Sequence, residues 1–392
     1  MKKYNFDEPV NRWNTNSVKY DFAQKYFKTD DLIPMWVADM DLKAPDFIME
    51  AMEARLQHPV FGYTLKSSGF YEAVARWQKV RFQWEIQEDW VSFSPGVVPA
   101  VSMSILAYTN PGDKIIVQSP VYHPFFSVVK GNKRELVNNP LKRSGDSYEM
   151  DFDHLESVID QDVKMLILCS PHNPVGRVWR KDELERLAEI CIKNDILILS
   201  DEIHQDIVYQ GNHHIPLASL SPEIREHVIT AVAPSKTFNI AGLAASAVII
   251  PNKKLHHRYE KILNDLHLGM GNIFGFVALK AAYMKGEDWL DQMMAYLEGN
   301  VNFAGNFIKE RIPGIKMIRP EATYLLWLDC NGLGMGKQEL KEFMIHEAKL
   351  GLNDGPTFGS GGEGFQRMNI GCQRETLRRA LEQLENAVNN RS

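Results

Sequence analysis

The chain contains 392 residues, more than one ordinary domain, so we expect two domains that share an interface. With 44% hydrophobic and 24% charged residues it can bury large cores, and this composition excludes an intrinsically disordered protein. The formal net charge of −6 leaves no excess positive charge for binding nucleic acid or anionic lipid, so we expect neither as a partner.

The cysteines and the N-terminus indicate the compartment. The four cysteines lie far apart, without the CxxC or Cys/His spacing of metal ligands: Cys169, Cys191, Cys330 and Cys372. We therefore expect no disulfide framework, no metal site and a reducing environment. The first residues, MKKYNFDEPVNRWN, lack the apolar core of a signal peptide, and the longest apolar run, around Ala241–Ile250, is too short to span a membrane. These features predict a soluble cytoplasmic protein.

The predicted elements follow a regular order along the chain. The first forty or so residues are irregular, but Met35, Trp36 and Val37 would be rare in a disordered tail, so we expect an ordered arm. Amphipathic segments such as Lys181–Asn194 predict helices farther along. Between them lie short apolar runs without alternation, typical of strands buried on both faces: Trp90–Phe93, Lys114–Gln118, Met165–Cys169, Ile196–Ser200, Val228–Ala233 and Ala245–Ile250.

This alternation predicts the fold class. Strands that alternate with helices indicate an α/β protein whose mostly parallel central sheet is sandwiched by helices. After a long helical segment, Asp288–Arg311, shorter strands and helices predict a smaller C-terminal α+β domain. We expect residues 1–45 to form an N-terminal arm and part of the small domain, residues 46–285 the large domain, and residues 286–392 the small domain.

Polar residues follow several predicted strands, and in open α/β sheets ligands bind beyond the carboxyl ends of the strands. Gly96, followed by Val97 and Val98, opens a helix, where free N–H groups favour a phosphate. This peptide alone is more typical of an ordinary tight turn. Asn173 lies between two prolines that stiffen its backbone, so its amide either donates to a phenolate oxygen or belongs to a rigid turn.

Two further strand ends carry ionisable residues. Asp201 ends a strongly apolar strand, where a carboxylate is costly without a partner. It could keep a pyridinium nitrogen protonated, with support from His204; the alternative is a helix cap beside a surface histidine. Lys236 also follows a strand, and a partly desolvated lysine has a lowered pKa and can form an imine. Most lysines, however, are solvated surface residues.

Taken together, Asn173, Asp201 and Lys236 resemble the fold-type-I enzymes that depend on pyridoxal 5′-phosphate (PLP), the aspartate aminotransferase superfamily. The three residues are 28 and 35 positions apart, each after a predicted strand, and the resemblance extends from about Asn14 to the end of the chain. It implies that PLP is the cofactor and that the large domain binds it through Lys236.

Longer motifs resemble the bacterial cystathionine β-lyase/cysteine desulfhydrase branch of this superfamily. They are W-V-A-D-M-D (Trp36–Asp41), F-G-Y-T (Phe61–Thr64), S-P-V-Y (Ser119–Tyr122), S-P-H-N-P-V-G-R-V-W (Ser170–Trp179), D-E-I-H-Q-D (Asp201–Asp206) and A-P-S-K-T-F-N-I-A-G-L (Ala233–Leu243). Many aminotransferases carry an arginine on the phosphate where this chain has Ala244, and this departure also favours the lyase branch.

The resemblance implies roles for the residues around the cofactor. Tyr122 stacks on its ring, Asn173 donates to its phenolic oxygen, and Asp201 pairs with its ring nitrogen with His204 in support. The phosphate is held by backbone and side-chain groups of Gly96, Val97, Val98 and Ser235.

The resemblance also assigns residues to the substrate and to a second subunit. Arg367 grips the α-carboxylate of the amino acid, and the backbone N–H of Ala38 contributes to the same group. The alternative for Arg367 is a solvated charge, although it lies in an apolar, strand-like stretch. Tyr63 reaches the phosphate of the neighbouring subunit, which implies a homodimer with shared active sites.

The expected activity is elimination of a thiol from an L-amino acid, with Lys236 removing the Cα proton. L-Cystathionine would give homocysteine, pyruvate and ammonia, and L-cysteine would give sulfide in place of homocysteine. Transamination would use the same residues and stays open. A PLP-binding regulator that contacts a transcription factor is a third alternative, although the chain carries no added DNA-binding motif.

Overall fold

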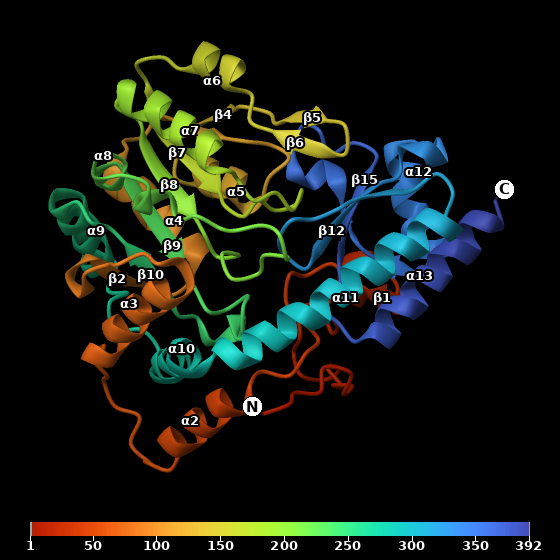
Figure 1. The fold of residues 1–392 in the computed structure, drawn as a ribbon, viewed down its shortest axis with the longest axis horizontal. Helices are drawn as coiled ribbons and strands as arrows, with labels where there is room; N and C mark the ends of the chain where they lie inside the picture. The colour runs from red at the N-terminus through yellow and green to blue at the C-terminus, as the bar shows by residue number, and fades with distance from the viewer. Residues whose placement is uncertain (1, 392) are drawn as a thin grey trace.

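A seven-stranded sheet is the central feature of the computed structural model, which describes residues 2–391 (Figure 1). The strands lie in the order β2 (Val91–Ser94), β10 (Ser246–Ile249), β9 (Val228–Val232), β8 (Leu197–Asp201), β7 (Val163–Cys169), β3 (Lys114–Val117) and β4 (Glu135–Asn138). β10 is antiparallel to both of its neighbours, and the other pairs are parallel. The predicted α/β fold with a mostly parallel central sheet is confirmed.

Helices cover both faces of this sheet. In chain order the helices are α1 (Ala23–Phe27), α2 (Asp46–Leu56), α3 (Ser68–Phe82), α4 (Val97–Tyr108), α5 (Pro124–Gly131), α6 (Phe152–Val158), α7 (Lys181–Lys193), α8 (Pro222–Glu226), α9 (Lys253–Asp265), α10 (Ile273–Lys285), α11 (Glu287–Arg311), α12 (Lys337–Glu342) and α13 (Arg374–Asn389). Leu166 and Leu168 of β7 point into one core, which includes the apolar side of α7, whereas Ile167 points into another beneath α4, α5 and α9. Burial on both faces explains the continuous apolar runs of these strands.

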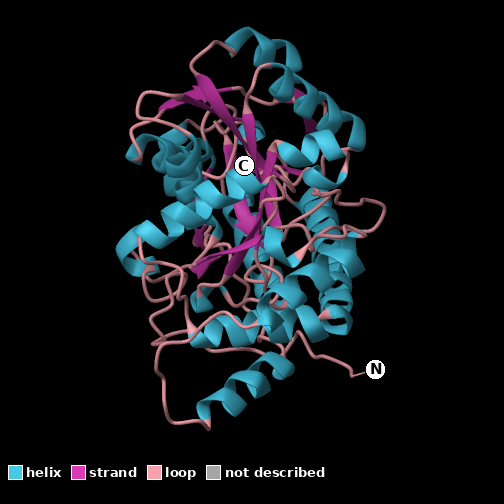
Figure 2. Cartoon of the chain, turned by 90° about the vertical axis from the view of Figure 1, so that its left-hand side faces the viewer, coloured by secondary structure: helices cyan, strands magenta, loops and turns pink. Residues whose placement is uncertain are grey.

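A second, antiparallel sheet lies in the C-terminal part of the chain. Its strands follow the order β11 (Lys316–Ile318), β12 (Leu325–Asp329), β15 (Phe365–Asn369) and β14 (Asn353–Asp354). The long helix α11 packs against α13 and β11. Figure 2, which separates helices from strands by colour, shows the helices around the sheets. Because β15 pairs with β12, Arg367 lies opposite Trp327 in the middle of this sheet.

The N-terminal arm is ordered and bonded to the second sheet. β1 (Ile33–Pro34) pairs with β13 (Leu350–Gly351), and the N–H of Asn369 donates to the Met35 carbonyl at 2.9 Å. Farther along, the N–H of Asp41 donates to the Gly371 carbonyl at 2.6 Å. Residues 35–41 therefore lie beside the strand that carries Arg367.

Some elements were not predicted from the sequence. Strand β4 is at the edge of the central sheet and only half-buried, so it lacks an apolar run. The hairpin β5 (Lys142–Ser144) and β6 (Ser147–Glu149) is largely polar, because most of its residues are exposed or only half-buried. Among residues 2–391, no helix has the length and apolar character that would be needed to cross a membrane.

Candidate active site

The carboxyl ends of three neighbouring strands meet at one cavity. β8 lies between β7 and β9, so Asp201 at the end of β8 lies beside the residues that follow the other two strands. The cavity has a volume of about 200 Å³. Its wall includes most of the residues predicted for the site: Ala38, Gly96, Val97, Val98, Tyr122, Asn173, Asp201, His204, Ser235 and Lys236.

Asp201 is a buried acid with few partners. Its side chain accepts a hydrogen bond from the N–H of Ile203 at 3.1 Å, and the residue is 3% exposed. Burial raises the pKa of Asp201 to about 7, against the lowering effects of that N–H and of the Lys236 charge. A buried carboxylate of this kind is suited to pair with a cationic N–H group, because such a group offsets the cost of desolvation.

Lys236 is the amine of the cavity. Its Nζ donates to the carbonyl oxygen of Ala38 at 2.7 Å, and the hydroxyl of Tyr324 donates to the same oxygen at 2.9 Å. Burial lowers the pKa of Lys236 to about 8, aided by the positive charge of Arg367 and opposed by nearby carboxylates. An amine with a lowered pKa is available as a nucleophile and as a base near neutral pH.

The start of α4 forms an anion cradle on another wall. Gly96 precedes the helix with φ 156° and ψ 163°, a conformation that is essentially restricted to glycine. A Cβ at this position would lie 3.3 Å from Cδ of Pro99, so a larger residue would crowd the turn. The N–H groups of Val97 and Val98 are in the first turn, where a helix leaves its donors free. With Ser235 on the same cavity, these groups suit a phosphate.

Arg367 completes the site from the second sheet. Its guanidinium donates to Oδ1 of Asn173 at 3.0 Å, to the Trp36 carbonyl at 2.8 Å and to Oδ1 of Asn353 at 2.5 Å. Its Nε is buried without a hydrogen-bond partner among the described residues, and its described hydrogen-bond partners include no carboxylate. Burial lowers the pKa of Arg367 to about 10, still far above neutrality. The alternative of a solvated charge is therefore wrong, and the buried cation suits an anionic ligand.

His204 does not bond Asp201 in the way the sequence suggested. No hydrogen bond joins the two side chains among the described contacts, and Nδ1 of His204 is buried without a partner. Burial lowers the pKa of His204 to about 3, with smaller lowering effects of Lys236 and Arg367, so the ring is neutral. The ring lies edge-on to Tyr324 at 6.2 Å between centroids. β8 ends at Asp201 and a turn follows, so His204 does not lie on a continuation of the strand, as the prediction assumed.

Ala38 and Tyr122 line the cavity, and Tyr63 does not. The carbonyl of Ala38, rather than the predicted N–H, makes the observed contacts of this residue. Burial raises the pKa of Tyr122. Tyr63 is 97% exposed, in the loop between α2 and α3 that projects from the body at the lower left of Figure 1. It is not among the residues that line the cavity of its own chain.

Sequence reasoning missed several polar residues of the site. Tyr324, directly before β12, donates to the Ala38 carbonyl, and Asn353 of β14 accepts a hydrogen bond from Arg367. No local pattern marks them, because their partners lie far away in the sequence. Asn369 had a weak signal, since it lies two positions after Arg367 on the same face of β15. Among the described residues, no group of three or more His, Cys, Asp or Glu side chains could hold a metal ion.

Comparison with known proteins agrees with this site. Residues 32–384 match the sequence model of the family Aminotransferase class I and II. The chain belongs to this family. Within the class I and II family, it is similar to cystathionine β-lyase PatB of Bacillus subtilis (strain 168), with 43% identity over 385 residues, or 98% of this chain and 100% of PatB.

Solved structures of similar proteins share the whole fold. Cystalysin from Treponema denticola, which contains a pyridoxal 5′-phosphate cofactor, has 36% identity and a TM-score of 0.96 over 100% of both chains. The PLP-bound C–S lyase from Staphylococcus hominis has 35% identity and a TM-score of 0.92, and the match covers 99% of this chain and 98% of that chain. The chain therefore has the same architecture as these two proteins along its whole length.

Proposed function

We propose that the protein is a PLP-dependent C–S β-lyase that acts on cystathionine- and cysteine-type L-amino acids and releases a thiol or sulfide, pyruvate and ammonia. The observation that carries this proposal is the cavity lined by Lys236 and Asp201, with Arg367 hydrogen-bonded to Asn173 of the cavity wall, in a chain that is 43% identical to a cystathionine β-lyase over its full length. Asp201 and Arg367 are buried and Lys236 is half-buried, and the described hydrogen-bond partners of the three side chains include no oppositely charged group.

The residues of the cavity fit PLP. The cradle at Gly96, Val97 and Val98 suits the phosphate, the Asp201 carboxylate suits a protonated ring nitrogen, and the Lys236 amine suits the aldehyde carbon. When bound, PLP supplies an electron sink for the charge that develops at Cα of the substrate.

The protein's own groups then perform the positioning and the proton transfers. Arg367 binds the α-carboxylate and fixes the orientation of Cα; two parallel N–H bonds make such a contact geometrically specific. Lys236, with its lowered pKa, removes the Cα proton. The thiolate leaves Cβ with the bonding electron pair, and water hydrolyses the remaining three-carbon fragment to pyruvate and ammonia.

Transamination is the second candidate, because it begins with the same proton removal. The named relatives favour elimination: chains of 43% and 32% identity are cystathionine β-lyases, whereas an aspartate aminotransferase of Pyrococcus horikoshii is 25% identical. No described contact separates a lyase site from an aminotransferase site, so the proposal rests on these relatives and is decided by the products.

The products of L-cystathionine decide between the two reactions. We expect the PLP-loaded protein to form pyruvate, ammonia and homocysteine in equal amounts without any added keto acid. Dependence of turnover on a keto acid, with transfer of the amino group to it, would identify an aminotransferase and contradict the proposal. L-Alanine, which has the same α-amino and α-carboxylate groups but no leaving group, is the control and should yield no pyruvate in the absence of a keto acid.

We also infer that the protein is a homodimer whose active sites contain Tyr63 of the partner subunit. Tyr63 is 97% exposed, and apolar neighbours of the same projecting loop are also exposed: Val60, Phe61 and Leu65. An exposed apolar segment of this kind is typical of an interface. In a two-fold dimer, each loop would serve the site of the other chain.

Mixed dimers of inactive variants test this arrangement. Tyr63→Ala and Lys236→Ala chains, unfolded and refolded together, should regain part of the activity, because each mixed dimer has one site with both defects and one site with neither. Lys236→Ala mixed with Asp201→Asn is the matched control, since both residues line the same chain's cavity, and it should regain none. If the first mixture forms mixed dimers but stays inactive, Tyr63 serves its own chain.

A further inference from the structure

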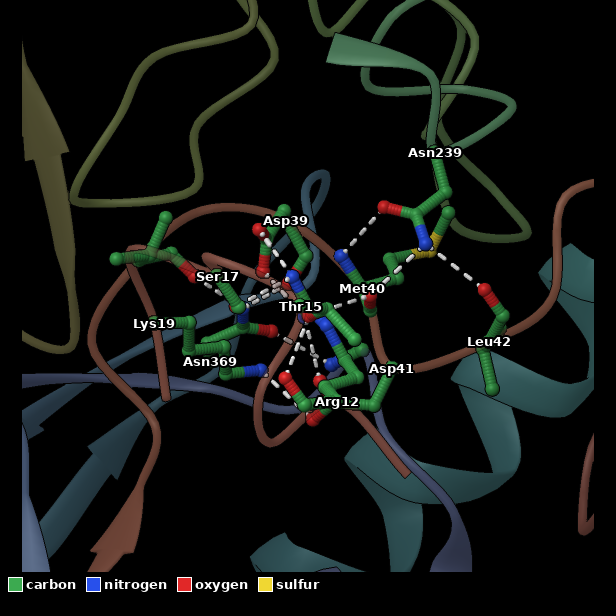
Figure 3. Close-up of polar contacts among 12 residues, drawn as sticks. Arg12, Thr15, Ser17, Lys19, Asp39, Met40, Asp41, Leu42, Asn239 and Asn369 are labelled. Carbon is green, nitrogen blue, oxygen red and sulfur yellow. Dashed lines mark hydrogen bonds and ion pairs between the residues drawn. The ribbon is translucent and has the colours of Figure 1, made fainter. Parts of the chain in front are cut away.

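Residues 37–42 form a backbone segment between the two reactive parts of the site. Asn369, two positions after Arg367, donates from Nδ2 to the carbonyls of Val37 and Asp39, at 2.6 Å each. From the other side, Asn239 lies three positions after Lys236. Its Nδ2 donates to the carbonyls of Met40 and Leu42 at 2.8 Å, and its Oδ1 accepts from the Met40 N–H at 2.9 Å (Figure 3). The segment thus links the turn that carries Lys236 to strand β15, which carries Arg367.

An ion-pair network holds the same segment from the N-terminal arm (Figure 3). Arg12 donates to both carboxylate oxygens of Asp39, at 2.8 and 2.7 Å, and to Asp41 at 2.7 Å. Asp41 also accepts from the buried amine of Lys19 at 2.7 Å. The Arg12 and Asp39 side chains are only 18% and 22% exposed, so their bidentate contact is stronger than an ordinary surface pair.

This network faces Lys236. Arg12, Asp39 and Lys236 line a second cavity of about 730 Å³, which adjoins the first at Ala38 and Ala241. After burial, the negative charge of Asp39 is the largest influence on the pKa of Lys236, and it raises that pKa.

Other ionisable groups face Lys236 from the remaining elements. The Arg367 charge lowers the pKa of Lys236, and the Asp201 charge raises it. His204 is neutral and is itself influenced by the lysine. Tyr324 shares the Ala38 carbonyl with the lysine amine. Lys236 lines both cavities, whereas Asp39 lines only the second and Asp201 only the first, so Asp39 supplies its negative charge from the second cavity.

We propose that the Arg12–Asp39 ion pair is a positioning unit of the active site. It fixes the Ala38 carbonyl against Lys236, and the positive charge of Arg12 offsets the negative charge of Asp39 that acts on the lysine nitrogen. The inference rests on the proposed attachment of PLP to Lys236. Neither residue needs to contact the substrate for this role: Asp39 acts through the adjacent carbonyl and through its charge, and Arg12 neutralises that charge and holds it in place.

Removing one member of the pair at a time tests this role in the PLP-loaded full-length protein. The readout is the pH midpoint of the visible absorption change of the PLP–lysine linkage. Asp39→Asn removes one anion, so that the two cations Arg12 and Lys19 are balanced only by Asp41, and the net positive charge should lower the midpoint. Arg12→Gln leaves the Asp39 charge uncompensated, so the midpoint should rise. We expect each shift to be roughly half a pH unit or more, because charges close to a titrating group have effects of this size.

The direction of the two shifts separates positioning from general stability. Both variants lose the same ion pair, so both should unfold at a lower temperature. A purely structural role would produce that loss alone, or equal shifts of the same sign, and would overturn the proposal. Arg12→Lys, which keeps the charge, should restore the wild-type midpoint even if Arg12→Gln is too unstable to titrate; a midpoint displaced upward in Arg12→Lys would also contradict the charge balance.

Asp31→Asn is the matched control. It also replaces one aspartate of the N-terminal arm and breaks an ion pair with the C-terminal part, that of Lys349 and Asp31 at 2.5 Å, and we expect no shift of the midpoint. The wild-type titration tests the proposed function separately. If wild-type protein shows no lysine-linked PLP band, both proposals fail; a normal band without opposite shifts in the variants contradicts only the role of the ion pair.

Discussion

Replacing Lys236 by Ala is expected to abolish the elimination of thiol from L-cystathionine. The loss of the base alone should lower turnover by about 10²–10⁴-fold, and loss of the covalent attachment of PLP adds to this effect. The Ala38 carbonyl and Tyr324 would remain, but neither supplies an amine. Steady-state formation of pyruvate by the PLP-incubated variant measures the loss. Turnover within tenfold of wild type would show that Lys236 is not the base.

Reduction of the wild-type protein with borohydride gives an independent measurement. PLP should become fixed to one peptide, which contains Lys236, and Lys236→Ala protein should retain no label. Lys66 provides an internal control, because burial also lowers the pKa of its amine, although it lies outside the cavity. Label on the Lys66 peptide, or on any other lysine, would contradict the assignment of the site.

Replacing Asp201 by Asn is expected to separate activity from stability. Turnover should fall by about 10²–10⁴-fold, because a neutral amide does not hold a protonated ring nitrogen and the electron sink is weakened. PLP should stay attached, since Lys236 and the phosphate cradle are unchanged. A variant with near-normal turnover would show that Asp201 is not the partner of the ring nitrogen.

The stability of the PLP-free Asp201→Asn protein should change in the opposite direction. Because burial raises the pKa of Asp201 from 3.8 to about 7, the folded chain binds this proton more tightly than the unfolded chain. Stability from this group is therefore lost as the pH rises through that window, and the charge is unfavourable above it. Asn does not titrate, so the variant should be more stable than wild type at about pH 8, and this advantage should shrink toward about pH 4.

Asp206→Asn is the matched control for both measurements. Asp206 is also a buried acid whose pKa burial raises, but its oxygens already accept from Thr237 at 2.7 Å and from Trp77 at 2.9 Å. An amide accepts at only one of its two positions, so this variant should unfold at a lower temperature at either pH. Equal stability changes in the two variants, measured by thermal unfolding, would contradict the view that Asp201, unlike Asp206, has no side-chain donor among its described contacts.

The central part of the site followed from the sequence because its signals are local. Each buried strand is a short apolar run, and each polar residue comes directly after its strand, so the order Asn173, Asp201 and Lys236 predicted three groups at one sheet edge. Parallel neighbours place their carboxyl ends together whatever the details of packing. The edge strand β4 and the hairpin of β5 and β6 escaped prediction because half-buried or exposed strands need no such run.

Contacts between distant segments were decided only by the tertiary structure. Arg367 and Asn173 are 194 positions apart, and Lys236 and Ala38 are 198 apart, yet each pair is hydrogen-bonded. Packing of the second sheet against the end of the first sets these contacts, and no periodicity or local spacing encodes it. The same holds for the contact between Arg12 and Asp39, which are 27 positions apart. The sequence by itself therefore determined the α/β sheet and the order of the reactive groups along its edge, whereas the long-range packing of the arm and second sheet decided their partners, burial and charge.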